Sequence, residues 1–228
     1  MAEWRDDAGL FELMRRELFT AVVGDAMDEV GLVRQFLPPE VQPLRDDMVV
    51  AGRAMPVLEA DWTDRDGGSM EDEGPFGLMF EALDDLGPNE VYICTGASPT
   101  YALWGELLST RAMKLGAAGA VLDGFSRDTR GILNLNFPTF CAGRYAQDQR
   151  VRGRVVDYRC TLTLSNGAGV SPGDIVFGDL DGVVIVPTAA EADVIDRALD
   201  KVRGENRVRE AIERGMSASE AFERFGIM

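Results

Sequence analysis

Apolar side chains recur at helical spacing near the start of the chain. Residues 8–31 contain two such patches. The first patch forms one face of a helix, and the second follows it and ends at Gly31. Gly31 is typical of the residue just beyond a helix, because glycine readily adopts the left-handed conformation found there. The pattern therefore predicts packed N-terminal helices within residues 1–35. The first apolar face is formed by Leu10, Leu13, Met14 and Leu18.

The middle of the chain changes to short apolar runs separated by turn residues, which is typical of strands. Between the second and third of these runs, a helical apolar face begins near Trp104 and would end at Gly116. The pattern predicts a strand–loop–helix–strand unit inside a strand-rich region. The expected strands lie within residues 41–58, 90–95, 118–122, 138–142, 154–164 and 175–187.

Two polar segments complete the pattern. Residues 62–77 are acidic and rich in glycine, which indicates a loop; at roughly 15 residues it is long enough for a lid, although a surface excursion is the simpler interpretation. Residues 188–228 predict a helical tail, in which Thr188 with Glu191 and Ser217 with Glu220 each match a capping box. The polar majority of the tail indicates a helix that is solvated or lies across a neighbouring subunit.

Composition and charge then narrow the possible partners. The chain has 228 residues, of which 46% are hydrophobic, so it can bury a sizeable core. Its apolar runs are much shorter than the roughly 20 residues of a membrane span, and its first residues do not resemble a secretory signal. A net charge of −16 disfavours binding to nucleic acid phosphates. We expect a cytoplasmic protein whose partners are small molecules or proteins.

The absence of histidine is the most informative feature of the composition. It excludes Ser-His-Asp and Cys-His triads, a histidine general base and histidine ligands to zinc. Cys94, Cys141 and Cys160 are widely spaced and fit structural thiols better than a disulfide framework or a zinc site. Any enzymatic chemistry would rest on carboxylates, Arg, Lys, Tyr, water and a hard metal ion such as Mg²⁺ or Mn²⁺.

The start of the central helix is a candidate anion site. Gly105 is small enough for a ligand to approach the backbone. The next three amides are candidates for the unpaired N–H groups of a first helical turn, which attract anions. A carboxylate there would gain hydrogen bonds and the favourable end of the helix dipole. These amides belong to Glu106, Leu107 and Leu108.

A second candidate group follows the next strand, in the segment VLDGFSRDTRG. If the two loops face each other, Arg127 could clamp the same carboxylate in a bidentate manner. Asp128 could hold a divalent ion whose shell is completed by water, and Glu106 could orient one of those waters. The simpler alternative is a surface pair worth under about 1 kcal/mol, beside a glutamate that only stabilises its helix. Spacing alone leaves both interpretations open.

A resemblance to a known family adds to these patterns. The segment WGELLSTRAMKLGAAGAVLDGFSRD, followed by FPTFCAG, SPGD and DLDGVVIVP, closely resembles the RraA-like family. That family includes 4-hydroxy-4-methyl-2-oxoglutarate/4-carboxy-4-hydroxy-2-oxoadipate aldolases and the regulator of ribonuclease activity A. The likeness covers about residues 18–228 and includes VVGDAMDEVG near the start.

The resemblance implies an α/β fold of the swivelling β/β/α type. It implies a single domain over residues 1–228, with N-terminal helices in residues 1–35 and a helical tail in residues 188–228 that reaches a neighbouring subunit. It further implies a homotrimer or homohexamer with active sites at subunit interfaces. Neither nucleic acid nor a membrane is expected as a partner.

The resemblance also implies roles for individual residues. Asp128 corresponds to the ligand of Mg²⁺ or Mn²⁺, and a neighbouring subunit would contribute an acidic residue, for which Glu205 is the best match and Glu210 an alternative. The implied activity is that of a class II pyruvate aldolase acting on 4-hydroxy-2-oxo acids, with oxaloacetate decarboxylation as a side activity. The implied substrate-binding residues are Gly105, Glu106, Leu107, Leu108 and Arg127.

Two alternatives remain open at this point. The chain could be a regulator that binds an endoribonuclease of RNA degradation. It could also be a family member with a different 2-oxo acid substrate, because residues 62–77 and the segment GRYAQDQRVRGR depart from the best-known aldolases. Where the family usually has a P-x-D type turn, this chain has Tyr145-Ala146-Gln147-Asp148. This departure concerns the distal half of the substrate.

Overall fold

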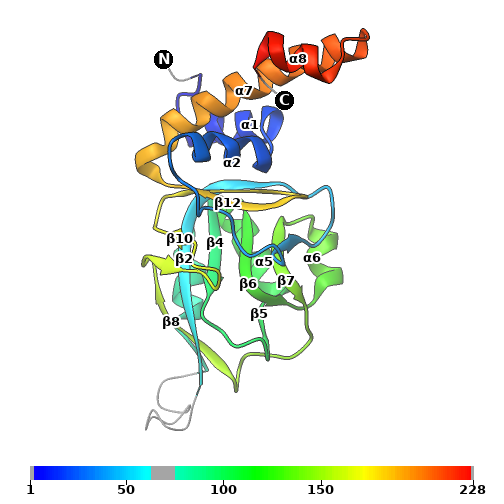
Figure 1. Cartoon of the computed structure of the whole chain (residues 1–228). Coiled ribbons are helices and arrows are strands. Elements are labelled where there is room, and N and C mark those ends of the chain that lie inside the picture. Colours follow the sequence, from blue (N-terminus) through cyan, green and yellow to red (C-terminus); the bar gives the residue numbers. More distant parts are fainter. Residues whose placement is uncertain (1–2, 63–74, 227–228) are drawn as a thin grey trace.

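A ten-stranded mixed sheet forms the centre of this computed structural model, which describes residues 3–62 and 75–226 (Figure 1). A short antiparallel pair, β9 and β10, lies outside that sheet. The main strand order is β1 (Gln42–Pro43), β7 (Thr139–Arg144), β6 (Gly119–Ser126), β4 (Glu90–Thr95), β2 (Val50–Asp61), β11 (Ile175–Asp179) and β12 (Gly182–Val186). The remaining strands are β3 (Phe76–Gly77), β5 (Ala102–Trp104), β8 (Gly153–Tyr158), β9 (Leu162–Thr163) and β10 (Gly169–Val170).

Four central strands, β2, β4, β6 and β7, run parallel to one another. Strands of this kind are covered on both faces, so they consist of continuous apolar runs rather than alternating ones. Val91, Ile93 and Val121 are accordingly fully buried. The carboxyl ends of these strands therefore meet at one edge of the sheet, which is where α/β proteins commonly place their ligands.

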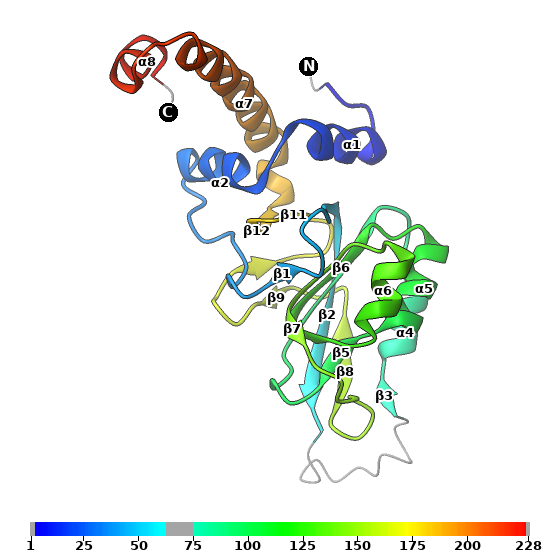
Figure 2. The same ribbon diagram turned by 90° about the vertical axis from the view of Figure 1, so that its right-hand side faces the viewer.

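Helices cover the two sides of the sheet in separate groups (Figure 2). The helices α4 (Met79–Asp84), α5 (Glu106–Leu115) and α6 (Thr129–Leu135) form one group and pack on the larger hydrophobic cluster. The other group, α1 (Asp7–Glu17), α2 (Thr20–Glu29) and α7 (Glu191–Glu213), packs on a second cluster with β11 and β12. A final helix, α8 (Ala218–Phe225), follows α7 at the end of the chain (Figure 1).

The hairpin of β11 and β12 separates the two clusters. Because successive side chains of a strand point to opposite faces, Val183 and Ile185 belong to the larger cluster, whereas Val184 and Val186 belong to the second. The five residues of β12 are all buried. One hairpin therefore contributes to two cores at once.

A partly buried arginine ties the second helical group to the sheet. Arg53 of β2 donates from Nε to Asp7 of α1 at 3.0 Å and forms an ion pair with Glu191, the first residue of α7. Its guanidinium also lies 5.5 Å from the centre of the Phe11 ring. The two acidic partners raise the pKa of Arg53 further above its usual value. The starts of α1 and α7 are thus held at one point of the sheet.

Most elements predicted from the sequence are confirmed. The N-terminal helices are present, β4 covers the predicted residues 90–95, and α5 ends at Gly116, which has a φ of 81°. Ser217 and Glu220 form the predicted capping box of α8. The α/β fold class is likewise confirmed. Of the acidic segment 62–77, residues 63–74 lie outside the described part of the chain, so the lid hypothesis remains a prediction.

Two local predictions are wrong. Thr188 does not cap α7, because its N–H and hydroxyl both donate to Asp174 at 2.9 and 3.1 Å, and residues 188–190 form a 3₁₀ turn instead. The strand expected at 118–122 continues to Ser126, and a short helix for which no prediction was made, α6, begins at Thr129. Among the described residues, no helix has both the length and the apolar character to span a membrane.

Replacing Arg53 by alanine is expected to lower the free energy of unfolding by about 2 kcal/mol, because two carboxylates lose a largely buried cationic partner. Urea denaturation monitored by circular dichroism measures the change. Arg111→Ala is the matched control, since Arg111 pairs with Asp84 on the surface and should contribute under about 1 kcal/mol. Equal losses in the two variants would contradict a structural role for Arg53.

Candidate active site

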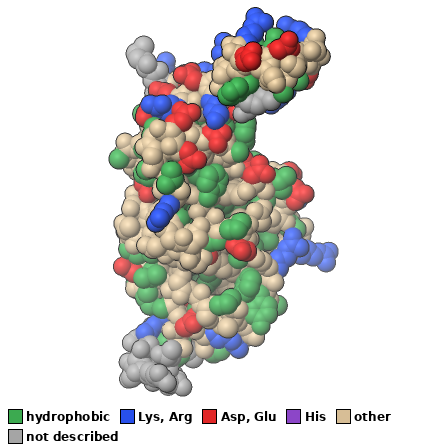
Figure 3. Space-filling model, viewed as in Figure 1, with side chains coloured by type: hydrophobic (Ala, Val, Ile, Leu, Met, Phe, Trp, Pro, Cys, Tyr) green, Lys and Arg blue, Asp and Glu red, His purple; other side chains and the backbone are tan. Residues whose placement is uncertain are grey.

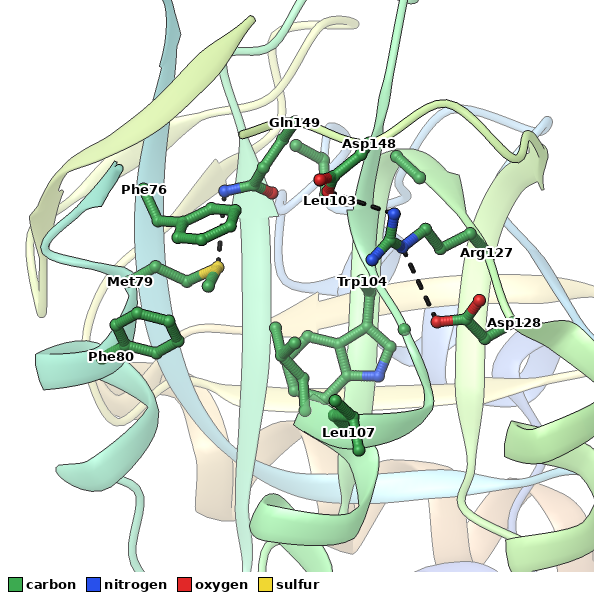
Figure 4. Close-up of a pocket in the computed structure, with 13 residues that line it drawn as sticks. Phe76, Met79, Phe80, Leu103, Trp104, Leu107, Arg127, Asp128, Asp148 and Gln149 are labelled. Atoms are coloured by element: carbon green, nitrogen blue, oxygen red, sulfur yellow. Dashed lines mark hydrogen bonds and ion pairs between the residues drawn. The ribbon is translucent and has the colours of Figure 1, made fainter. Parts of the chain in front are cut away.

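A cavity of about 260 Å³ lies between the start of α5, the end of β6 and the segment after β7 (Figure 4). One side of it is polar and carries Arg127, Asp128 and Asp148. The opposite side is apolar and comes from β3 and α4. The lining residues are Phe76, Met79, Phe80, Ala102, Leu103, Trp104, Gly105, Leu107, Leu108, Arg127, Asp128, Asp148 and Gln149.

The pairing of β5 with β6 brings the two candidate loops together. These strands are parallel, and Trp104 is the register partner of Ser126. The main-chain N–H of Arg127 donates to the carbonyl of Trp104 at 2.9 Å. Gly105 therefore lies next to Arg127 and Asp128, although about twenty residues separate them in the sequence. The crevice predicted between the two loops is confirmed.

Gly105 leaves room for the carboxylate of Asp128. Its φ of −154° is an extended conformation open to any residue, but a Cβ atom there would lie 2.7 Å from Oδ2 of Asp128. Asp128 itself has a φ of 55° at the start of α6, and its side chain makes no capping bond to that helix. The carboxylate of Asp128 therefore faces the start of α5 rather than its own helix. Non-glycine residues adopt this left-handed conformation uncommonly, and aspartate is among those that do so most readily.

Arg127 is held between two carboxylates. Its Nη1 lies 3.1 Å from Oδ1 of Asp148, and its Nε lies 3.6 Å from Oδ2 of Asp128 (Figure 4). About a third of the Arg127 side chain is exposed, on the cavity side. The adjacent pair noted in the sequence is thus part of a group of three charges rather than an isolated surface salt bridge.

The first turn of α5 offers backbone donors to the cavity. Gly105 provides no side-chain cap, and the first N–H groups of a helix have no intrahelical acceptor. The buried Trp104 indole donates to Ser109 Oγ at 2.7 Å, and that hydroxyl donates to the Gly105 carbonyl at 3.0 Å. These bonds fix the helix start against the core. The amides of Leu107 and Leu108 are therefore presented at a defined place beside Arg127.

The other predicted acidic residues, Glu106, Glu205 and Glu210, do not line the cavity of their own chain. Glu106 does not line the cavity; its carboxylate lies over the first turn of α6, where a Cβ on Gly131 would be 2.2 Å from Oε2. Glu205 lies on α7, which packs against α2 at the opposite end of the molecule (Figure 1). Within one chain neither Glu205 nor Glu210 reaches the cavity, so their role through a neighbouring subunit remains a prediction.

Some lining residues were not predicted from the sequence, namely Asp148, Gln149 and the apolar wall formed by Phe76, Met79 and Phe80. Asp148 belongs to the segment in which the chain departs from the best-known aldolases, and that departure was the available signal. The wall residues lie more than twenty positions before Gly105 and carry no motif. Their proximity follows from the sheet, in which β3 pairs with β8.

The donor set fits one type of metal ion. Among the described residues, no group of three or more His, Cys, Asp or Glu side chains could ligate an ion together. That arrangement does not fit structural or catalytic zinc. It does fit Mg²⁺ or Mn²⁺, which retain several waters and bind through one or two carboxylates plus substrate oxygens. Asp128 is the carboxylate in position to do so, because it lines the cavity beside the open amides of α5.

A second group of ionisable side chains lies beneath the loop that leads to β5. Glu59 of β2 is buried, and its Oε1 finds no hydrogen-bond partner among the described residues. Burial raises the pKa of the Glu59 carboxyl to about 8, and the negative charge of Asp61 adds to the shift. The Tyr101 hydroxyl donates to Asp61 at 2.9 Å. Glu59 is therefore largely protonated at neutral pH.

The fold and the cavity define a class of α/β proteins with a pocket at the carboxyl ends of parallel strands, built from helix amides and an arginine. The chain belongs to the RraA-like family, since the family pattern, described as Aldolase/RraA, matches residues 20–185. This membership agrees with the resemblance found in the sequence.

Two individual relatives are similar to most of this chain. A protein of Halalkalibacterium halodurans named "Putative 4-hydroxy-4-methyl-2-oxoglutarate aldolase" is 28% identical over 208 residues, which cover 91% of this chain and 90% of that protein. Protein DlpA of Legionella pneumophila is 27% identical over 206 residues. The match covers 90% of this chain but only 32% of DlpA, so the chain spans about a third of that relative.

Solved structures share the fold. An uncharacterized protein from Pseudomonas syringae pv. tomato superimposes with a TM-score of 0.79 at 25% identity, over 94% of this chain and 96% of that one. Streptomyces coelicolor RraAS2, described as an unusual member of the RNase ES inhibitor RraA protein family, gives a TM-score of 0.77 at 23% identity. That match covers 91% of this chain and 99% of RraAS2, and it shows the fold alone.

Glu59→Gln is expected to change the pH dependence of stability. In the wild type, Glu59 keeps its proton in the folded state up to a pH of about 8, whereas the unfolded chain releases that proton above the ordinary pKa of 4.5. The contribution of Glu59 to the free energy of unfolding therefore falls as the pH rises from about 4.5 to about 8. Each unit of pKa difference corresponds to about 1.4 kcal/mol. The stability gained by Glu59→Gln over wild type should therefore increase across this window.

Urea denaturation at pH 5, 6, 7 and 8 measures this effect. Glu81→Gln serves as the control, because Glu81 is exposed on α4 and should leave the shape of the pH profile unchanged. Parallel profiles for wild type and Glu59→Gln would show that Glu59 is ionised in the folded protein.

Proposed function

We propose that this protein is a divalent-metal-dependent lyase that cleaves 4-hydroxy-2-oxo acids and releases pyruvate. The observation that carries the proposal is the convergence of three groups on one cavity: the open amides of α5, the Arg127 guanidinium and the Asp128 carboxylate. Membership of the RraA-like family and the name of the Halalkalibacterium relative support the same reaction class.

The positive end of the site binds the carboxylate of the substrate. The amides of Leu107 and Leu108 and the guanidinium of Arg127 donate to it, combining helix-end and charge-assisted hydrogen bonds. Arg127 must then exchange Asp148 for the substrate, because its Nη1 is engaged with that residue at 3.1 Å. The binding groups hold the 2-oxo acid in one orientation before bond cleavage.

Bond cleavage places negative charge next to Arg127. The proton of the 4-hydroxyl leaves to a water, the bond between C3 and C4 breaks, and its electron pair forms the enolate of pyruvate. Asp128 would hold Mg²⁺ or Mn²⁺ together with water, and the bound ion would act as a Lewis acid toward the 2-oxo group. Arg127 is a fixed cation at the place where charge develops, which is the usual source of rate enhancement.

Two related properties belong to the same proposal. Loss of CO₂ from oxaloacetate forms the same pyruvate enolate as aldol cleavage. A decarboxylase side activity would therefore accompany the aldolase activity. We further propose a homotrimer or homohexamer in which α7 of a neighbouring subunit brings Glu205 to the cavity, since α7 packs against α2 and Glu205 does not line the cavity of its own chain.

Arg127→Ala is expected to lower kcat/KM for pyruvate release from 4-hydroxy-4-methyl-2-oxoglutarate by about 10²-fold to 10³-fold, because charge stabilisation is lost. Asp128→Asn and treatment with EDTA should abolish turnover, and Mg²⁺ or Mn²⁺ should restore it after EDTA only when Asp128 is present. A coupled lactate dehydrogenase assay measures pyruvate, and oxaloacetate provides a second substrate.

Arg130→Ala is the matched control, since Arg130 is exposed on α6 and does not line the cavity. Metal-independent turnover, or full activity in Asp128→Asn, would refute the mechanism. A protein inactive on all 2-oxo acids that captures an endoribonuclease would be a regulator instead.

Gly105→Ala tests the close approach of the two loops. The new Cβ would meet Oδ2 of Asp128 at 2.7 Å, so the carboxylate must shift, and displacements of this size can reduce a rate by about 10²-fold. The expected result is a strongly reduced kcat/KM with a change in unfolding free energy of under about 1 kcal/mol. Gly169→Ala is the control, because a Cβ at Gly169 meets open space. Unchanged kinetics in Gly105→Ala would place the reaction elsewhere.

A further inference from the structure

The cavity has two chemically different halves. Figure 4 shows Arg127, Asp128 and Asp148 on one side and Phe76, Met79 and Phe80 on the other. The proposed function uses only the first half, where the 2-oxo carboxylate would bind. The second half must therefore contact the rest of the substrate, which is the group attached to C4.

The second half presents apolar surface. The rings of Phe76 and Phe80 pack edge to face with their centres 5.5 Å apart, and Phe80 remains 52% exposed. Leu107 at the start of α5 is 81% exposed. Large apolar side chains that stay open to a cavity gain free energy when a ligand covers them.

The polar group in this wall already has a partner. The Gln149 side chain is buried and donates from Nε2 to the sulfur of Met79 at 3.4 Å. Its amide nitrogen is therefore engaged with the wall itself. A substrate group in this half of the cavity meets mainly rings, methylene groups and a thioether.

The charges at the cavity disfavour a second carboxylate. Among the described lining residues, Arg127 is the single cation, and it stands against Asp128 and Asp148. Once Arg127 binds the 2-oxo carboxylate, Asp148 loses its partner at 3.1 Å and carries an uncompensated negative charge. A divalent ion at Asp128 would offset charge at that end of the cavity, away from the apolar wall. Like charges at such distances repel in a partly desolvated site.

We propose that this pocket selects 4-hydroxy-2-oxo acids whose substituent on C4 is an alkyl or aryl group rather than a carboxylate. The inference rests on the proposed function and defines its substrate class. Cleavage breaks the bond between C3 and C4, the hydroxyl oxygen loses its proton and becomes the carbonyl of an apolar aldehyde or ketone, and C3 takes up a proton to give pyruvate. Dicarboxylic substrates such as 4-hydroxy-4-methyl-2-oxoglutarate are turned over more slowly.

The test compares kcat/KM for a series of synthetic 4-hydroxy-2-oxo acids with methyl, ethyl, propyl and phenyl groups on C4 against 4-hydroxy-4-methyl-2-oxoglutarate. Covering one methylene group with apolar surface is expected to raise kcat/KM by about 4-fold. Across the series the propyl and phenyl substrates should exceed the dicarboxylate by at least about 10-fold.

Two variants reverse the preference if the inference is correct. Phe80→Arg places a cation in the exposed apolar wall, and Asp148→Asn removes the repelling charge; each should raise the ratio of dicarboxylate to propyl turnover by about 10-fold. Arg130→Ala, outside the cavity, should leave the ratio unchanged. A wild-type preference for the dicarboxylate, or unchanged ratios in both variants, would overturn the inference.

A separate measurement distinguishes this inference from the proposed function. Exchange of the methyl protons of pyruvate in D₂O, followed by NMR, requires only the Arg127 and Asp128 half of the site. Exchange in the wild type together with a dicarboxylate preference would overturn the substrate class alone. Absence of exchange and of cleavage for every acid would overturn the proposed function, and the inference with it.

Discussion

The pairing of the short strand β5 with the end of β6 is the interaction on which the cavity depends. It joins the carbonyl of Trp104 to the N–H of Arg127 at 2.9 Å and so places the start of a helix beside the residues that follow a strand. Trp104 is itself packed in the core, with ring centres 4.7 Å from Tyr92 and 6.3 Å from Phe137. The geometry of the candidate site is therefore set by the packing of the sheet beneath it.

Electrostatic balance is the second constraint. Arg127 is stabilised by two carboxylates, and an incoming carboxylate must compete with Asp148 for the same guanidinium. Such an exchange keeps the arginine paired in both states, which avoids the penalty of a desolvated charge without a partner. The backbone amides of α5 add a further binding contribution, and the N-cap residue does not compete for them because Gly105 has no side chain.

Much of the fold could be predicted from the sequence because its signals are local. The apolar run 90–95 and the glycine after α5 each determine a structure within a few residues. Thr188 failed as a cap because Asp174, fourteen positions earlier, binds it instead. The helix α6 was missed because it is seven residues long and starts from Asp128 in a left-handed conformation.

In the candidate site, too, residues with a local signal were predicted and residues brought together only by the sheet were not. Gly105, Arg127 and Asp128 were recognisable from a helix start, a strand end and the family resemblance, and the structure brings them together. Asp148 and the wall around Phe80 depend on which strands are neighbours in the sheet. Nothing in a single sequence specifies that adjacency.

The hairpin of β11 and β12 has a consequence for how this fold can diverge. Its alternating side chains supply one core under α5 and another under α1, α2 and α7. Apart from β2, which contributes Ala51 to the second cluster, the hairpin is the main element that the two cores share, and such cores can open as separate cooperative units. Substitutions on the outer surface of the terminal helices can therefore accumulate without repacking the residues of the same chain that line the cavity.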